Sequence, residues 1–246
     1  MPLVCTRSNV GLLVRARCAG RRKAIRRGLT TAPTPPPRSH DRAYVWQRRL
    51  ARESKVRYLL PMKQPGHLPR LDEANYRGRA WVHWTMATRD RARGWLDEKM
   101  HHHVRELLLH TMARYDLHCP GYCLMPDHAH FLWMGLGDDA DQILASRFFR
   151  KHWNVALCKH GVELQPQAYD HVLREKERQP DAFEDTVIYI FRNPQRAGLV
   201  QDWVDWPYRG SVLPGYPEIP GASFGEFWPV FWKIHNRETT KRHTRT

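Results

Sequence analysis

The sequence of 246 residues predicts an α+β fold, a ferredoxin-like split βαβ antiparallel sheet with helices on one face plus an additional C-terminal helix that bears a tyrosine. Two observations support this prediction. Segments rich in aromatic and β-branched residues alternate with segments whose apolar residues recur near every 3.6 positions. The expected order is strand, helix, strand, strand, helix, strand, helix, and the first six elements match the split βαβ pattern.

The individual elements follow from local patterns and their boundaries. The segment Met125-Pro126-Asp127 is typical of a short turn, so the strands on either side of it should pair antiparallel. Pro194 should kink the last helix because it removes a helical hydrogen bond, and Gly198 should end that helix. The expected strands are 79–88, 117–125, 128–134 and 168–173, and the expected helices are 95–115, 140–158 and 180–197.

The chain divides into four parts by composition. Residues 1–40 contain nine basic residues and no acidic one, which indicates a disordered basic arm, a targeting peptide, or sequence upstream of a true start at Met62. Residues 41–75 are expected to be an irregular extension. Residues 76–200 should form the catalytic domain, and residues 201–246 a C-terminal tail.

Charge and cysteine usage narrow the class of partner and the compartment. The formal net charge of +15 favours a polyanionic partner. No stretch approaches the roughly 20 apolar residues that a membrane helix needs, so no membrane partner is expected. The five cysteines form no Cys-X-X-Cys pair, which favours a reducing compartment, and we expect a cytoplasmic, bacterial protein. A zinc site at Cys119 and Cys123 is less favoured than two free core thiols.

His128 and His130 are candidate metal ligands. Residues two apart in a strand point to the same face, so the two imidazoles should lie side by side. Two imidazoles can hold one divalent metal ion, although a third ligand must come from elsewhere. Two histidines on a solvated sheet face would show the same spacing.

Tyr189 is the candidate nucleophile. On a helix, Tyr189 and Asn193 are four residues apart and share a face, so a hydroxyl and an amide can point at one place. A half-buried core tyrosine is the alternative. Tyr122 and Tyr169 compete for the role, but both lie on expected strands and have no polar partner one helical turn away.

Several basic and aromatic side chains are candidates for contact with nucleic acid. Mixed basic and aromatic residues suit phosphate contact and base stacking. A solvated helix face with its tryptophan in the core is an equally good interpretation. The candidates are Arg147, Arg150, Lys151, Trp153 and Arg196.

Two motifs resemble a known family. The segment from Tyr122 to Trp133 (YCLMPDHAHFLW) is similar to the HUH segment of the REP-associated tyrosine transposases, which are relatives of the single-tyrosine insertion-sequence transposases. The segment from Tyr189 to Val200 (YIFRNPQRAGLV) resembles the tyrosine helix of the same family. Residues 206–208 (WPY) and Ser211 follow at the usual distance. The resemblance covers roughly residues 76–211, and it departs from the family pattern at Phe191-Arg192 and in the long N-terminal extension.

The resemblance implies a metal-dependent enzyme that nicks and rejoins single-stranded or hairpin DNA through a covalent phosphotyrosine. His128, His130 and Asn193 would bind Mg²⁺ or Mn²⁺, and Tyr189 would be the nucleophile. The protein would act as a monomer or homodimer. Two other functions stay open: a domesticated module that binds DNA hairpins without nicking them, and a metal-dependent nucleic-acid phosphodiesterase that uses water as its nucleophile.

Overall fold

The computed structural model describes residues 70–219 and 224–243. Expectations for residues 1–40, and for the part of the extension before residue 70, fall outside these residues. The strands are Trp81–Ala87 (β1), Leu117–Met125 (β2), His128–Gly135 (β3), Tyr169–Val172 (β4) and Arg209–Val212 (β5). The helices are Glu98–Arg114 (α2), Gln142–Cys158 (α3), Pro180–Phe191 (α4), Asn193–Arg196 (α5) and Phe224–His243 (α6).

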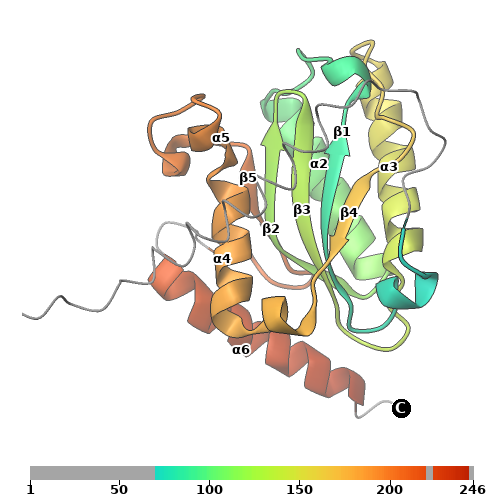
Figure 1. The fold of residues 1–246 in the computed structure, drawn as a ribbon, viewed down its shortest axis with the longest axis vertical. Helices are drawn as coiled ribbons and strands as arrows, with labels where there is room; N and C mark the ends of the chain where they lie inside the picture. The colour runs from blue at the N-terminus through green and yellow to red at the C-terminus, as the bar shows by residue number, and fades with distance from the viewer. Residues whose placement is uncertain (1–69, 220–223, 244–246) are drawn as a thin grey trace, which may run out of the picture. The chain divides into compact units, whose positions relative to one another are not determined.

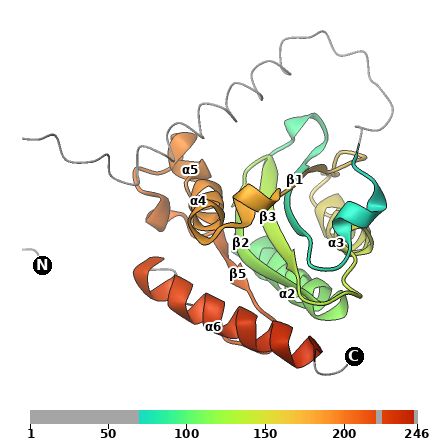
Figure 2. The same cartoon turned by 60° about the horizontal axis from the view of Figure 1, so that its bottom comes forward.

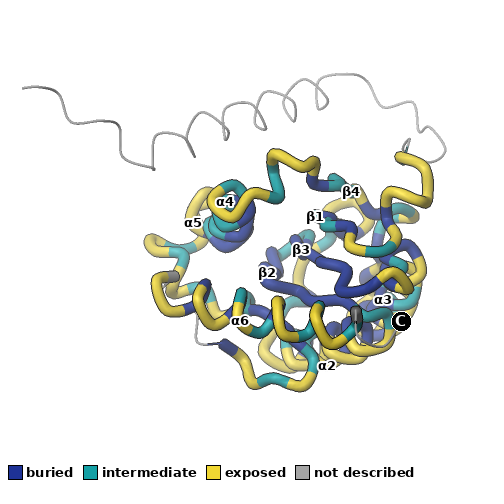
Figure 3. Tube along the Cα trace, turned by 90° about the horizontal axis from the view of Figure 1, so that it is seen from below, coloured by how far each residue is buried: buried dark blue, intermediate teal, exposed yellow. Residues whose placement is uncertain are grey.

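The five strands form one antiparallel sheet in the order β4-β1-β3-β2-β5 (Figure 1). Helices α2 and α3 cover one face, and α4 and α6 cover the other (Figure 2). Figure 3 shows β2 and β3 as a buried layer between these helices, whose outer sides are exposed, whereas β4 at the sheet edge is only partly buried. The predicted α+β class is confirmed.

Each face of the sheet has its own apolar core. Trp84, Phe131 and Trp133 point toward α2 and α3. Leu132 and Met134 alternate with these residues along β3 and point toward α4 and α6. His128 and His130 have the same parity as Leu132, so they belong to the face that α4 covers.

Acidic caps fix where the two helices of the first face begin. The Asp97 carboxylate accepts a hydrogen bond from the Met100 backbone N–H at 2.7 Å, and α2 starts at the next residue. The Asp141 carboxylate does the same for Leu144 at 2.9 Å, and α3 follows. Both helices lie within the ranges predicted from periodicity.

Helix α4 approaches the sheet closely at Gly121 on β2. A β-carbon at this position would lie 2.8 Å from Val187 Cγ1 of α4, closer than real contacts allow. The glycine therefore lets the tyrosine-bearing helix pack directly on the strand that precedes the histidine turn. The same stretch of β2 has an irregular register, and it leaves Cys119 in the first core and Cys123 in the second.

The predicted kink in the last helix is present. Helix α4 ends at Phe191, and the short helix α5 begins at Asn193, directly before Pro194. Gly198 then adopts a positive φ of 70° just after α5, as a helix-ending glycine does. Tyr189 and Asn193 therefore lie on two helical segments rather than on one continuous helix.

The structured part of the chain continues past residue 200, where the sequence suggested a tail. Strand β5 pairs with β2 at the sheet edge. Helix α6 buries Phe227, Trp228 and Phe231 against the second core. No helix within residues 70–219 and 224–243 is long and apolar enough to cross a membrane.

Candidate active site

His128 and His130 lie side by side at the start of β3, as their spacing predicts. Their Nε2 atoms are 3.1 Å apart, and their ring centroids are 4.9 Å apart. The His128 side chain is 19% exposed and His130 is 8% exposed, so the pair lies just beneath the surface. The turn at Pro126-Asp127 brings this end of β3 next to the end of β2.

Asp127 orients His128 from the turn. Its Oδ1 accepts a hydrogen bond from His128 Nδ1 at 2.6 Å, which leaves Nε2 of His128 as the nitrogen that faces His130. Burial lowers the pKa of His128 and outweighs the opposing effect of Asp127. Burial raises the pKa of Asp127, but the hydrogen bond from His128 and the nearby charge of Arg91 bring it below its usual value. We infer a neutral imidazole beside a carboxylate.

His130 is the more enclosed member of the pair. Burial lowers its pKa well below the usual range, and the charges of His83, His128 and Arg196 lower it further. A neutral imidazole keeps one lone pair that can bind a metal ion, and a protonated imidazole does not. His130 therefore suits a metal-binding role. Its other ring nitrogen, Nδ1, lies 3.2 Å from both Thr85 Oγ1 and His83 Nε2.

The two histidines fit a divalent ion as a pair of ligands. Ligands at right angles around an ion roughly 2.1 Å away would be about 3.0 Å apart, close to the separation of the two Nε2 atoms. Two lone pairs at this distance also repel each other unless a proton or a cation lies between them. Among the described residues, however, no group of three or more His, Cys, Asp or Glu side chains could hold a metal ion by itself.

Asn193 is positioned by the helix break rather than by the histidines. Its Nδ2 donates to the carbonyl oxygens of Tyr189 and Ile190, at 3.1 Å and 3.0 Å. The amide nitrogen thus caps the end of α4, and Oδ1 is the atom that a metal could use. The predicted role of Asn193 as third ligand stays a prediction.

Arg196 connects the tyrosine helix to the histidine pair. Its guanidinium carbon lies 4.4 Å from the centroid of the half-buried Tyr189 ring, in a cation–π arrangement. The same guanidinium is close enough to His130 to contribute to its lowered pKa. In Figure 1, α5 and the C-terminal end of α4 lie at the end of the sheet where β2 turns into β3.

The loop after β1 supplies basic residues that the sequence analysis did not single out. Arg91 Nη1 lies 3.6 Å from Asp127 Oδ2, and the charges of Arg91 and Arg93 both lower the pKa of His128. Asp90 and Arg91 have φ values of 53° and 56°, a left-handed conformation that is uncommon outside glycine and recurs at functional sites. The loop lies far from His128 and His130 in the sequence and reaches them only through the fold, so sequence analysis could not assign it to the site.

The structure corrects one candidate for nucleic-acid contact. Trp153 is fully buried, with its ring 5.5 Å from that of Trp95 and 6.0 Å from that of Phe131, so it belongs to the first core and cannot stack on a base. Arg150 is half-buried and donates to the Gln165 carbonyl. Arg147 and Lys151 are exposed on α3, the face opposite the histidines.

The two competing tyrosines differ in position. Tyr122 is fully buried in the first core, where its hydroxyl lies 2.8 Å from His101 Nε2, and burial raises its pKa. It therefore points away from the histidine pair. Tyr169 on β4 is 47% exposed and pairs in register with Thr85, so it lies on the histidine face. It remains a competitor of Tyr189.

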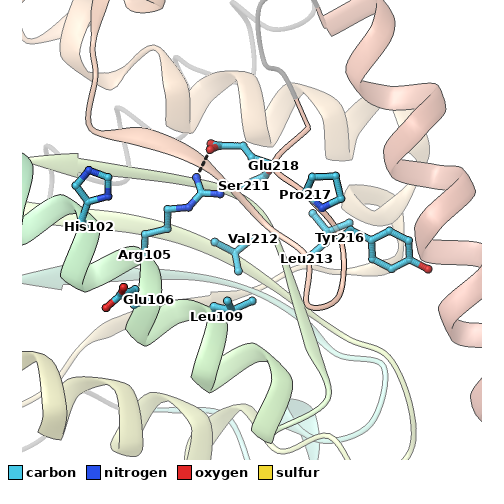
Figure 4. A pocket seen from close by; sticks show the side chains of 10 residues that line it. All are labelled: His102, Arg105, Glu106, Leu109, Ser211, Val212, Leu213, Tyr216, Pro217 and Glu218. Atoms are coloured by element: carbon cyan, nitrogen blue, oxygen red, sulfur yellow. Dashed lines mark hydrogen bonds and ion pairs between the residues drawn. The ribbon is translucent and has the colours of Figure 1, made fainter.

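A pocket of about 240 Å³ lies elsewhere, between α2 and the segment that follows β5 (Figure 4). Arg105 and Leu109 line it from α2, and an ion pair between Arg105 and Glu218 crosses its edge. Neither His128 nor His130 lines this pocket. The candidate active site is therefore the histidine pair and its surroundings, not this pocket.

Two known proteins that are similar to this chain carry the name REP-associated tyrosine transposase. No family model matches the chain. The chain is 22% identical over 157 residues to a Haemophilus influenzae protein whose assignment as a REP-associated tyrosine transposase is provisional, covering 57% of this chain and 86% of that protein. A solved REP-associated tyrosine transposase bound to a REP hairpin superposes with a TM-score of 0.49 and 21% identity, covering 59% of this chain and 82% of that one.

Proposed function

We propose that this protein nicks and rejoins single-stranded or hairpin DNA through a covalent phosphotyrosine on Tyr189. The observation that carries the proposal is the position of Arg196, which stacks on Tyr189 and also acts electrostatically on His130. A phosphate near this guanidinium would lie close to both the tyrosine and the histidine pair. The similarity to a REP-associated tyrosine transposase supports the same substrate class.

The proposed reaction is a transesterification. Tyr189 Oη forms a bond to the phosphorus while one backbone P–O bond of the DNA breaks, and the phenol proton ends on the departing hydroxyl. Because the phosphoester bond is retained on the tyrosine, rejoining to another DNA hydroxyl needs no ATP. Arg196 and Arg91 would hold the charged phosphate in place.

His128, His130 and the Oδ1 atom of Asn193 would hold Mg²⁺ or Mn²⁺. When bound, such an ion neutralises charge on a non-bridging phosphate oxygen and makes the phosphorus easier to attack. The chain's own contribution is to present two neutral imidazoles, with Asp127 fixing the tautomer of His128.

Tyr189→Phe tests the nucleophile directly. A labelled hairpin oligonucleotide is incubated with Mn²⁺ and the protein, and the mixture is separated by denaturing electrophoresis. The wild type should become covalently attached to DNA, and Tyr189→Phe should form no adduct. Loss of one hydroxyl barely changes side-chain volume, so the variant should fold and bind the hairpin as the wild type does.

Tyr169→Phe is the matched control, because Tyr169 is an exposed tyrosine on the same face of the sheet. It should form the adduct normally. An adduct that survives in Tyr189→Phe but disappears in Tyr169→Phe would move the nucleophile to β4. Cleavage without any adduct would favour the water-using phosphodiesterase, and hairpin binding without cleavage would favour the binding module.

A further inference from the structure

Strand β1 places two polar side chains behind the His130 ring. Thr85 is directly opposite His130 in the register of β1 and β3, and its Oγ1 lies 3.2 Å from His130 Nδ1. His83, two residues earlier on the same face, brings its Nε2 to 3.2 Å from the same nitrogen. The opposite ring nitrogen of His130 faces His128. His83 and Thr85 therefore contact the side of the ring that a metal ion would not use.

These contacts provide hydrogen-bond acceptors that an imidazole bound to a cation requires. When Nε2 of a neutral histidine binds a cation, the proton must be on Nδ1, and a buried N–H needs an acceptor. A threonine hydroxyl can accept this hydrogen bond, and so can the unprotonated nitrogen of a neutral histidine.

His83 lies in a row of polar residues that crosses the sheet. It pairs in register with His171 on β4, and His171 Nε2 lies 2.9 Å from Glu177 Oε1. At the other end of the row, Asp127 bonds to His128. The row thus ends in a carboxylate on each side, and four histidines lie between the two carboxylates: His171, His83, His130 and His128.

We propose that His83 and Thr85 are positioning residues, which hold the His130 ring through Nδ1 so that Nε2 faces His128 and a shared divalent cation. This inference rests on the proposed function, because it assumes that the pair binds metal. The inference extends the candidate site to His83 and Thr85, which lie outside the sequence motif that contains His128 and His130. Loss of such outer partners typically weakens metal binding by about 10–100-fold.

The test measures Mn²⁺ binding to the full-length protein by isothermal titration calorimetry. The double variant His83→Leu/Thr85→Val removes both partners while keeping apolar bulk, and it should bind Mn²⁺ about 10–100-fold more weakly than the wild type. The conservative variant His83→Gln/Thr85→Ser keeps an acceptor at each position and should bind within a few-fold of the wild type. With Mg²⁺ bound, nitrogen NMR should show His130 protonated at Nδ1 in the wild type and in the conservative variant.

His118→Leu is the control for the loss of a buried histidine, because His118 lies on β2 against His235, away from the pair. It should leave Mn²⁺ affinity unchanged. Equal affinity in the wild type and the double variant would overturn the positioning role alone. Equal loss in the double and conservative variants would also overturn it, since packing rather than hydrogen bonding would be responsible. Absence of Mn²⁺ binding by the wild type would instead refute the metal-dependent part of the proposed function.

Discussion

At the scale of single residues, the candidate site consists of a pair that the sequence predicts and partners that it does not. The same-face spacing in a strand was enough to place His128 beside His130. His83 and Thr85 could not be assigned in the same way, because their contact with His130 depends on the register between two strands that are far apart in sequence. Arg91 reaches the site through a left-handed loop whose conformation has no clear sequence signature.

Arg196 offers a residue-scale prediction. Arg196→Ala should weaken hairpin binding, and the slope of log affinity against log salt concentration should become less negative by about 1, because one phosphate contact is lost. Adduct formation should also slow, because the variant loses the charge beside Tyr189 and His130. Fluorescence anisotropy over a salt series measures the binding, and denaturing electrophoresis measures the adduct.

Two variants serve as controls for Arg196→Ala. Arg196→Lys keeps the charge and should retain most of the salt dependence, although it loses the planar stacking on Tyr189. Lys159→Ala removes an exposed charge directly after α3, on the other side of the sheet, and should change adduct formation little. An Arg196→Ala variant that matches the wild type in salt slope and adduct rate would remove Arg196 from the site.

At the scale of elements, the sequence pattern predicted every strand and α-helix from β1 to α4. Most of these segments are long, and helices α2 and α3 begin at the capping residues Asp97 and Asp141. Strand β5 is as short as β4, but half of its residues are Arg209 and Gly210, which give it no strand pattern. Helix α6 has a helical spacing of aromatic residues, but Pro229 within it interrupts the pattern. The apolar surface that makes this helix stable belongs to α4 and the sheet.

Helix α6 should stabilise the domain through its buried aromatic side chains. Phe231 is fully buried and packs against Phe183 and Trp232, so Phe231→Ala should lower the free energy of unfolding by about 3–5 kcal/mol. Val230, the preceding residue, is 44% exposed, and Val230→Ala should change the free energy of unfolding by less than about 0.5 kcal/mol. Urea denaturation followed by circular dichroism gives both values. Equal effects of the two substitutions would show that α6 does not pack on the domain as described.

At the scale of the whole molecule, a chain with a net charge of +15 keeps several of its histidines neutral inside the fold. Burial lowers the pKa of His83 and His118 to about 3 and that of His101 and His235 to about 4. In the unfolded chain, each of these histidines would become protonated as the pH falls below about 6.5. Acid should therefore destabilise the protein well before its carboxylates are protonated.

The pair His118 and His235 allows this effect to be measured away from the candidate site. His118 on β2 meets His235 on α6, with ring centroids 5.8 Å apart, and both are buried. The charged groups that act on them electrostatically are Arg79, Arg242 and Glu238. Protonation would place two positive charges in the contact between α6 and the sheet, where two arginines already contribute positive charge.

The sign of the pH effect follows from the two pKa values. The folded state binds these protons only below about pH 4, whereas the unfolded state binds them below about pH 6.5. The stability that depends on their neutral form is therefore complete above pH 6.5 and is lost as the pH falls toward 4. Near pH 5 the two groups together should contribute about 2–3 kcal/mol per pH unit to the slope of unfolding free energy against pH.

Urea denaturation between pH 5 and pH 7.5 tests the predicted pH dependence of the unfolding free energy. The double variant His118→Leu/His235→Leu is compared with the wild type. The double variant should have a slope that is smaller by the stated amount. Groups present in both proteins, such as His83 and Glu184, cancel in the comparison. Equal slopes would mean that the two histidines are already protonated in the folded protein, and α6 would then have to tolerate buried charge where it contacts the sheet.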